Sequence, residues 1–137
     1  MTTKLMLLTG LSFFALDALI ASKASSDLQR KKSVEKLIKE FEKDIPVPTI
    51  TVDKLLGLKK SDRKSQYLIV DVRQDYERKV SAIPDSISKE DFEKNKGSFK
   101  GKKIVPYCTI GYRSAKYTKK LVSQGFDAQN MRGSILL

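Results

Sequence analysis

Two continuous apolar runs limit what this chain can fold into: "QYLIVDVR" at residues 66–73 and "KKIVPYC" at residues 102–108. Runs of this kind are typical of strands that are buried on both faces of a parallel sheet. Shorter strand signals and helical patterns alternate with them. The predicted strands are residues 48–51, 66–73, 82–87, 102–108 and 127–131, and the predicted helices are residues 52–57, 75–79, 88–95 and 111–125, with another helix opening at 133–137. The alternation predicts an α/β sandwich with a mainly parallel central sheet and helices on both faces.

Local signals set the ends of the predicted helices. Thr51 precedes the first of them and Gly57 is expected to end it. Ser88, followed by acidic residues, is a favourable start for another helix. In the helix at 111–125, Gly125 is the expected C-terminal cap. The residues of that helix expected to face the core are Ala115, Thr118, Leu121 and Val122.

The first 24 residues have a composition of their own. A lysine at position 4 precedes an apolar run from Leu5 to Ala21, and small residues dominate positions 21–25. This order is that of a secretory signal peptide, so we expect residues 1–24 to be a signal peptide or membrane anchor, with a secretory, periplasmic or membrane location. Asp17 interrupts the run, which is also shorter than the roughly 20 residues of a membrane span. An organelle presequence or an amphipathic helix therefore stays open.

Residues 25–48 are predicted to form a helical spacer. Apolar residues recur at i, i+3, i+4 and i+7, with lysine and glutamate between them; they are Val34, Leu37, Ile38 and Phe41. Pro46 and Pro48 end the pattern because proline does not continue a helix. The domain itself is expected at residues 49–137.

Charge and residue counts narrow the classes of function. The formal net charge is +11, but the lysines are spread among acidic residues and form no basic stripe interleaved with aromatic residues, so nucleic-acid binding is not expected. One cysteine allows no internal disulfide, and without histidine the chain has no zinc-binding pattern. We therefore expect neither a metal ion nor another cofactor.

The single cysteine, Cys108, lies at the carboxyl end of the second buried run, just before a predicted helix. In open α/β sheets, ligands bind at this edge. The four residues between Cys108 and Arg113 include Gly111 and can turn several backbone N–H groups towards one point. Such a loop favours an anion and lowers the pKa of a thiol, so Cys108 can be a nucleophile without histidine. The alternative is a buried, unreactive core cysteine.

Three stretches carry a family resemblance: "LIVDVRQDYE", "IPDSI" and "IVPYCTIGYRSAKYTKKLVSQGFDAQNMRGSI". They resemble the rhodanese-like domain, the sulfurtransferase family, over residues 49–137, and the most specific part is Cys-x-x-Gly-x-Arg-Ser after an apolar strand. The resemblance implies a rhodanese-like sandwich around a five-stranded parallel sheet. It also implies a loop cysteine that accepts a sulfane sulfur as a persulfide. The donor would be a small anionic sulfur compound or a thiol persulfide, and the acceptor a thiol or cyanide.

Carried over to this chain, the resemblance makes Cys108 the persulfide-bearing residue. The loop that would bind the substrate consists of Thr109, Ile110, Gly111, Tyr112 and Arg113. Of these, Arg113 is the expected contact for an anion. Asp71 and Arg73 of the upstream stretch are expected to support the site by linking the end of their strand to neighbouring loops.

Three departures from the family pattern bear on function. Thr109 stands where the family often has arginine, which leaves less positive charge for thiosulfate. Residues 81–86 read Ser-Ala-Ile-Pro-Asp-Ser in place of the frequent Gly-His-Ile-Pro-Gly-Ala. The family's final helix, typically with a tryptophan, would begin where this chain reaches Leu137, so that helix is expected to be incomplete, and the sequence has no tryptophan.

Three classes of function follow. The first is a sulfurtransferase or persulfide carrier that works through Cys108. The second is a non-catalytic rhodanese-like binding module, with or without a membrane tether. The third is a phosphatase or arsenate reductase, because the cell-cycle dual-specificity phosphatases share this fold. Their loop has five residues between cysteine and arginine where this one has four, so the smaller cradle suits a sulfur atom better than a phosphate.

Overall fold

The computed structural model describes residues 3–61 and 65–136, with side chains from residue 16 onward except at 62–64. It consists of two compact units, Met1–Ser33 and Val34–Leu137. Leu137, the expected start of the final family helix, lies outside the described residues, as do the side chains of the predicted leader up to residue 15.

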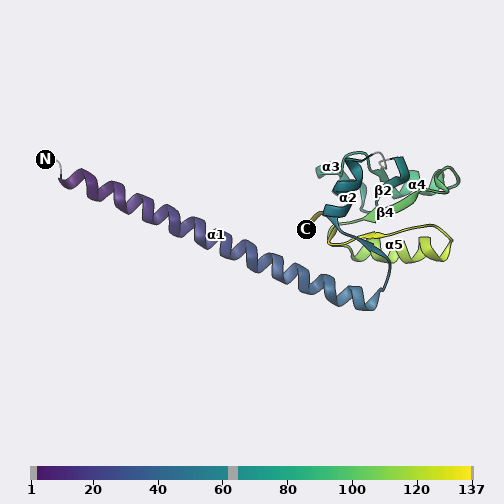
Figure 1. Ribbon diagram of the computed structural model, residues 1–137, viewed down its shortest axis with the longest axis horizontal. Coiled ribbons are helices and arrows are strands. Elements are labelled where there is room, and N and C mark those ends of the chain that lie inside the picture. The colour runs from purple at the N-terminus through teal and green to yellow at the C-terminus, as the bar shows by residue number, and fades with distance from the viewer. Residues whose placement is uncertain (1–2, 62–64, 137) are drawn as a thin grey trace. The chain divides into compact units, whose positions relative to one another are not determined.

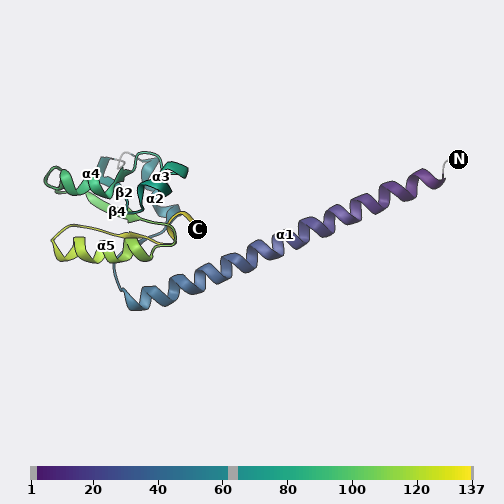
Figure 2. The same ribbon diagram turned by 180° about the vertical axis from the view of Figure 1, so that it is seen from behind.

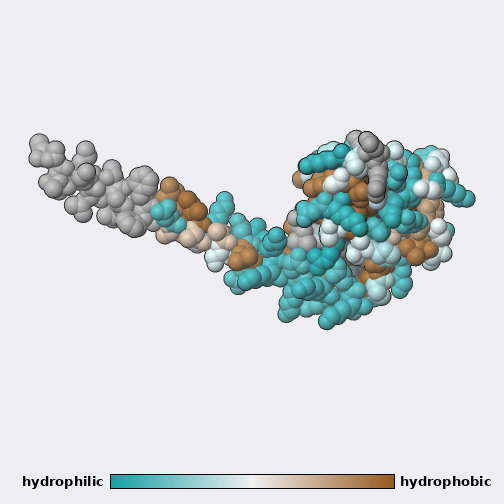
Figure 3. Space-filling view, viewed as in Figure 1, coloured by the Kyte–Doolittle hydropathy of each residue, from teal (hydrophilic) through white to brown (hydrophobic). Residues whose placement is uncertain are grey.

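One helix, α1 (Thr3–Asp44), includes both the predicted leader and most of the predicted spacer, where the sequence indicated a helical pattern from residue 25 (Figure 1). The described apolar side chains of the first unit are exposed, and Figure 3 shows hydrophobic side chains, in brown, on this part of α1. They include Leu16, Leu19, Ile20 and Leu28. Within the described part of the chain, no helix has both the length and the apolar character that crossing a membrane requires.

The second unit contains the sheet. β2 (Tyr67–Asp71) lies between β3 (Ile87–Ser88) and β4 (Lys103–Tyr107), and β1 (Thr49–Ile50) pairs with β5 (Asn130–Met131). Every pairing is parallel. A parallel bridge between Ile104 and Ala128 joins β4 to the segment that leads into β5. The five strands thus follow one another in the order β1–β5–β4–β2–β3, which agrees with the α/β fold expected from the sequence.

Successive side chains of the two central strands point to opposite faces of this sheet. On one face, Ile69 and Val105 pack in a cluster with Leu55 of α2 (Val52–Lys59). On the other face, Val70 and Ile104 pack in a cluster with α4 (Lys89–Lys94) and α5 (Tyr112–Ser123). Figures 1 and 2 show α2 and α5 on opposite sides of β4. This packing places the start of α5 beside the carboxyl end of β4.

The helix starts agree with the sequence patterns, and two helical details differ. The hydroxyl of Thr51 caps α2 and that of Ser88 caps α4, each accepting a backbone hydrogen bond. α2 continues through Gly57 to Lys59, so this glycine does not end the helix. Val122 was expected in the core but is 43% exposed. It lies about 100° around α5 from the buried Leu121 and in the last turn of the helix.

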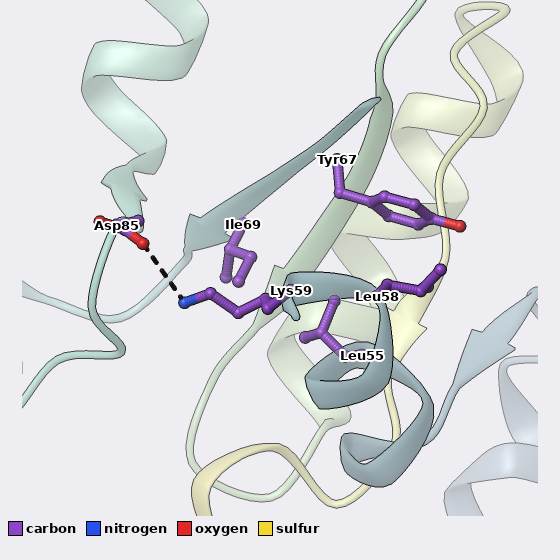
Figure 4. Close-up of a pocket in the computed structure, with 6 residues that line it drawn as sticks. All are labelled: Leu55, Leu58, Lys59, Tyr67, Ile69 and Asp85. Carbon is purple, nitrogen blue, oxygen red and sulfur yellow. Dashed lines mark ion pairs between the residues drawn. The ribbon is translucent and has the colours of Figure 1, made fainter. Parts of the chain in front are cut away.

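The strand predicted at 82–87 is mostly a turn, because Pro84 lacks an N–H and Asp85 has a left-handed backbone with φ of 66°. Aspartate tolerates this conformation better than most residues. Lys59 holds the turn: its ammonium donates to the Pro84 carbonyl at 2.8 Å and lies 3.6 Å from the Asp85 carboxylate. Figure 4 shows Lys59 reaching from α2 to Asp85 beside a small cavity of about 70 Å³. The apolar wall of the cavity is formed by Leu55, Leu58, Tyr67 and Ile69.

The last turns of α1 belong to the second unit. Ile38 is only 1% exposed. Arg132, which follows β5, forms ion pairs with Glu35 at 3.0 Å and with Glu42 at 2.9 Å. The compact unit therefore begins at Val34, within the stretch that the sequence assigned to the spacer.

Candidate functional site

Cys108 follows β4 directly, and α5 begins four residues later at Tyr112. The short connection depends on Gly111, whose φ of 101° is a backbone conformation that residues with a Cβ rarely adopt. The Asn130 side-chain amide donates to the Gly111 carbonyl at 3.1 Å and holds the loop in place. The sequence placed a nucleophile loop at this strand end, and the structure has a tight loop there.

The sulfur of Cys108 is surrounded by hydrogen-bond donors. The Gly111 N–H donates to Sγ at 3.1 Å, and the Ser114 hydroxyl donates to it at 3.5 Å. Burial raises the pKa of the thiol, but the Ser114 hydroxyl and the backbone N–H groups of Ser114, Gly111 and Ile110 lower it by more. The net pKa lies below its ordinary value. A thiolate can therefore form in a chain without histidine.

Ser114 is a residue that sequence reasoning did not assign to the site. The one hydrogen of its hydroxyl is shared between Cys108 Sγ at 3.5 Å and the Gly111 carbonyl at 3.2 Å, and the side chain is fully buried. A signal was present, because the serine closes the Cys-x-x-Gly-x-Arg-Ser motif and falls in the first turn of α5. That turn must face the loop if the loop is short.

Ser134 is a second residue that the sequence reading missed. Its hydroxyl accepts a hydrogen bond from the backbone N–H of Cys108 at 3.0 Å and donates to the Met131 carbonyl at 3.2 Å. Its φ is 52°, which is uncommon for a residue with a Cβ. The local sequence gives no signal for this contact, because Ser134 lies 26 positions beyond Cys108.

Arg113 is engaged by a carboxylate. Both oxygens of Glu77, on α3 (Asp75–Val80), accept hydrogen bonds from the guanidinium, at 2.6 and 2.7 Å. The Thr109 hydroxyl accepts from Arg113 Nη2 at 3.1 Å and donates to Glu77 Oε1 at 3.3 Å. Sequence analysis assigned Thr109 and Arg113 to the same substrate-binding loop but did not identify Glu77 as a neighbour. The residue it assigned to anion binding has a bidentate partner within the protein.

This ion pair shifts the pKa of both groups. The Arg113 guanidinium is the main cause that lowers the pKa of Glu77 from 4.5 to about 2. Glu77 in turn raises the pKa of Arg113, and the nearby Cys108 contributes in the same direction. The main partner of Arg113 is therefore Glu77, and the negative charge of a Cys108 thiolate adds to the same shift.

The other two loop residues contribute in different ways. Ile110 offers its backbone N–H towards the sulfur. Tyr112 is 39% exposed, and its ring packs edge-on against Phe41 with 5.7 Å between ring centroids. The ammonium of Lys116 lies 4.4 Å from the centre of the same ring. Tyr112 thus lies on the outer side of the loop.

Asp71 and Arg73 form a buried polar network at the end of β2. The Arg73 side chain donates to both oxygens of Asp71 at 3.0 and 2.8 Å, and also to the Ser81 carbonyl at 2.6 Å. The Tyr107 hydroxyl donates to Asp71 and accepts from the Ile83 N–H. Tyr107 immediately precedes Cys108, so this network fixes the end of β4 next to the cysteine.

Comparison with known proteins gives relatives of several kinds. A tRNA uridine(34) hydroxylase of Rickettsia akari is 35% identical over 83 residues, which are 53% of this chain and 34% of that protein. The chain thus spans about a third of the length of this curated relative. Among solved structures, a rhodanese-like domain protein from Staphylococcus aureus is 32% identical with a TM-score of 0.56, over 64% of this chain and 87% of that one.

A third relative is a protein of unknown function from Rhodopseudomonas palustris, described as a possible tyrosine phosphatase. It is 26% identical with a TM-score of 0.57, and the match covers 74% of this chain and 85% of that one. The model of the rhodanese-like domain family matches residues 51–136, which begin just after β1 and include the strands from β2 to β5 and the whole cysteine loop. This match covers more than half of the chain, and the chain belongs to the rhodanese-like domain family.

Proposed function

We propose that this chain transfers sulfane sulfur through a persulfide on Cys108. The observation that carries the proposal is the pair of donors at the sulfur: the Gly111 N–H at 3.1 Å and the Ser114 hydroxyl at 3.5 Å. Such donors stabilise the thiolate that attacks a donor molecule. They also favour the negative charge of the persulfide that forms. Membership of the rhodanese-like family supports the same chemistry.

The reaction divides into two balanced steps. The Cys108 thiolate attacks the outer sulfur of the donor, the donor's sulfur–sulfur bond breaks, and the donor leaves as a thiolate or as sulfite. An acceptor thiolate or cyanide then attacks the outer sulfur of the persulfide, and the Cys108 thiolate leaves. In each step the electron pair of the attacking group forms the new bond to sulfur, and the pair of the broken sulfur–sulfur bond stays on the leaving group, so these steps need no outside oxidant or reductant.

We confine the proposal to this cysteine chemistry. The relative from Rickettsia akari is named for tRNA uridine hydroxylation, but this chain covers only 34% of it. A tRNA substrate would need a basic surface of defined shape. The face of the domain in Figure 3 is largely hydrophilic, as expected for a chain with 27 lysine and arginine residues.

The test is the intact mass of the protein after incubation with a persulfide donor. The wild type is expected to gain the mass of one sulfur atom and to lose it again on addition of cyanide. Cys108→Ser removes the only cysteine in the chain and is expected to show no adduct. Circular dichroism of this nearly isosteric variant controls for folding. Absence of any sulfur adduct on the folded wild type would refute the proposal and favour the binding-module alternative.

A further inference from the structure

The carboxylate of Glu77 binds the guanidinium of Arg113, which is the cation that a sulfur oxyanion would otherwise contact. Glu77 comes from α3 and binds Arg113, 36 residues away, with both oxygens. Arg113 also donates to the Thr109 hydroxyl. A guanidinium has five N–H groups, and three of them are already engaged in this arrangement. The planar fork that recognises oxyanions is thus directed at Glu77.

The charges around the loop disfavour a dianion. The ion pair with Arg113 lowers the pKa of Glu77 to about 2, so its carboxylate is ionised at neutral pH. With the Cys108 thiolate, two negative charges lie close to the one positive charge of Arg113. These two negative charges repel a donor of charge −2 more strongly than the persulfide of an uncharged thiol, which carries at most charge −1.

We propose that Glu77 is a specificity-determining residue that selects thiol persulfides over thiosulfate as sulfur donors. The inference rests on the sulfur transfer proposed above. From a persulfide, the Cys108 thiolate takes the outer sulfur and an alkyl thiolate leaves, which collects a proton from water. From thiosulfate, the leaving group is sulfite, whose oxygens need Arg113, and Glu77 must release that side chain first.

Thr109 completes the arrangement. Its hydroxyl lies 3.3 Å from Glu77 Oε1 and 3.1 Å from Arg113 Nη2, so it bridges the two charged groups without adding charge. A cation at position 109 would reach the same carboxylate and compete with Arg113 for it. Thr109→Arg therefore tests the same inference as removal of the Glu77 charge, by a change on the other side of the ion pair.

The experiment measures the second-order rate of Cys108 loading, by intact mass, with thiosulfate and with hydroxyethyl persulfide. Glu77→Gln keeps an acceptor for the Gln74 N–H, which Glu77 now caps at 3.0 Å, and removes the charge. We expect the rate with thiosulfate to rise about tenfold, and more at low ionic strength, while the rate with the persulfide changes less than about twofold. Thr109→Arg is expected to act in the same direction. Asp75→Asn, on the same helix with an 81% exposed side chain, is the matched control and should change neither rate.

The outcomes separate the two proposals. If the wild type loads from the persulfide, and Glu77→Gln and Thr109→Arg both leave the ratio of the two rates unchanged, sulfur transfer stands and the role of Glu77 is refuted. An equal change in both rates refutes that role as well. If the folded wild type loads from neither donor, sulfur transfer itself is refuted. Thiosulfate loading as fast as persulfide loading in the wild type also overturns the inference.

Discussion

The backbone N–H of Cys108 donates a 3.0 Å hydrogen bond to the hydroxyl of Ser134, a residue whose own backbone is left-handed. The same hydroxyl donates a hydrogen bond to the Met131 carbonyl at 3.2 Å. The turn after β5 therefore fixes the position of the cysteine from a distant part of the chain. Because Ser134 carries a Cβ at φ of 52°, the contact is made at some conformational cost.

Two substitutions at Ser134 separate its hydrogen bonds from its strain. Ser134→Ala leaves the buried Cys108 N–H without a partner and should destabilise the protein by about 1–3 kcal/mol. Ser134→Gly loses the same bonds but relieves the left-handed strain, so it should be roughly 1 kcal/mol more stable than the alanine variant. Urea unfolding of the three proteins measures both effects. Equal stability of the two variants would contradict the role of strain at this position.

Removal of the Ser114 hydroxyl should make Cys108 less reactive at neutral pH. This hydroxyl lies 3.5 Å from the sulfur and lowers the pKa of the thiol. In the wild type, the rate of Cys108 alkylation should reach half its maximum below the ordinary thiol value of about 8.5. In Ser114→Ala the midpoint should move to higher pH, with a several-fold slower reaction at pH 7. Ser123→Ala, on the exposed end of the same helix, is the control. An unchanged midpoint in Ser114→Ala would count against the assignment.

The Glu77–Arg113 pair predicts a stability difference that depends on pH. The pKa of Glu77 is about 2 in the folded protein and 4.5 without its partners. A lowered pKa stabilises the fold above pH 4.5, and this contribution is lost as the pH falls from 4.5 towards 2. The melting temperature of the wild type should therefore exceed that of Glu77→Gln at pH 6, and the two should converge in acid. A difference that stays constant over this range would show that the ion pair does not cause it.

The length of the cysteine loop predicts weak phosphatase activity, even though one relative is described as a possible tyrosine phosphatase. Four residues separate Cys108 from Arg113, one fewer than in the phosphatases of this fold. Hydrolysis of an aryl phosphate by the wild type should be negligible, and insertion of one glycine before Arg113 should increase it. Cys108→Ser with the insertion controls for contaminating enzyme. Substantial turnover by the unmodified protein would overturn this geometric reasoning.

The leader predicted at residues 1–24 is testable in cells. The apolar run from Leu5 to Ala21 after an early lysine is the basis for the prediction. The full chain with a C-terminal tag should be found in a membrane or secreted fraction, and sequencing of its N-terminus should show whether cleavage occurs near residue 24. A soluble cytosolic product that retains Met1 would reject both the signal peptide and the anchor.

The parts of the fold that follow from local pattern could be predicted from the sequence. β2 and β4 are continuous apolar runs, and α5 has a buried stripe that includes Ala115, Thr118 and Leu121. The strand predicted before Ile87 was mostly wrong because a turn around Pro84 and Asp85 replaces it, and the Lys59 contact that holds this turn comes from α2. Nothing in the local sequence of residues 82–87 indicates that contact, because Lys59 lies 25 residues before Pro84.

For the candidate site, too, the local features could be predicted from the sequence and the long-range contacts could not. Cys108 and the loop to Arg113 are contiguous, so their grouping was visible in the sequence. Glu77 and Ser134 join the loop through side-chain contacts across 36 and 26 residues. Such contacts depend on how α3 and the turn after β5 pack around the strand ends. No periodicity within the sequence marks them, so they became apparent only in three dimensions.

The two ion pairs of Arg132 have a consequence for how the chain acquires its structure. Glu35 precedes Arg132 by 97 residues, and the pair joins the first and last parts of the second unit. During synthesis from the N-terminus, Glu35 and Glu42 at the end of α1 are made long before Arg132, so nearly the whole domain is synthesised before these ion pairs can form. Contacts with such long sequence separation form late and slow folding, because a long loop must be closed first. The two ion pairs that hold the end of α1 can therefore form only after Arg132 has been made, which places the docking of this helix end among the last steps of folding.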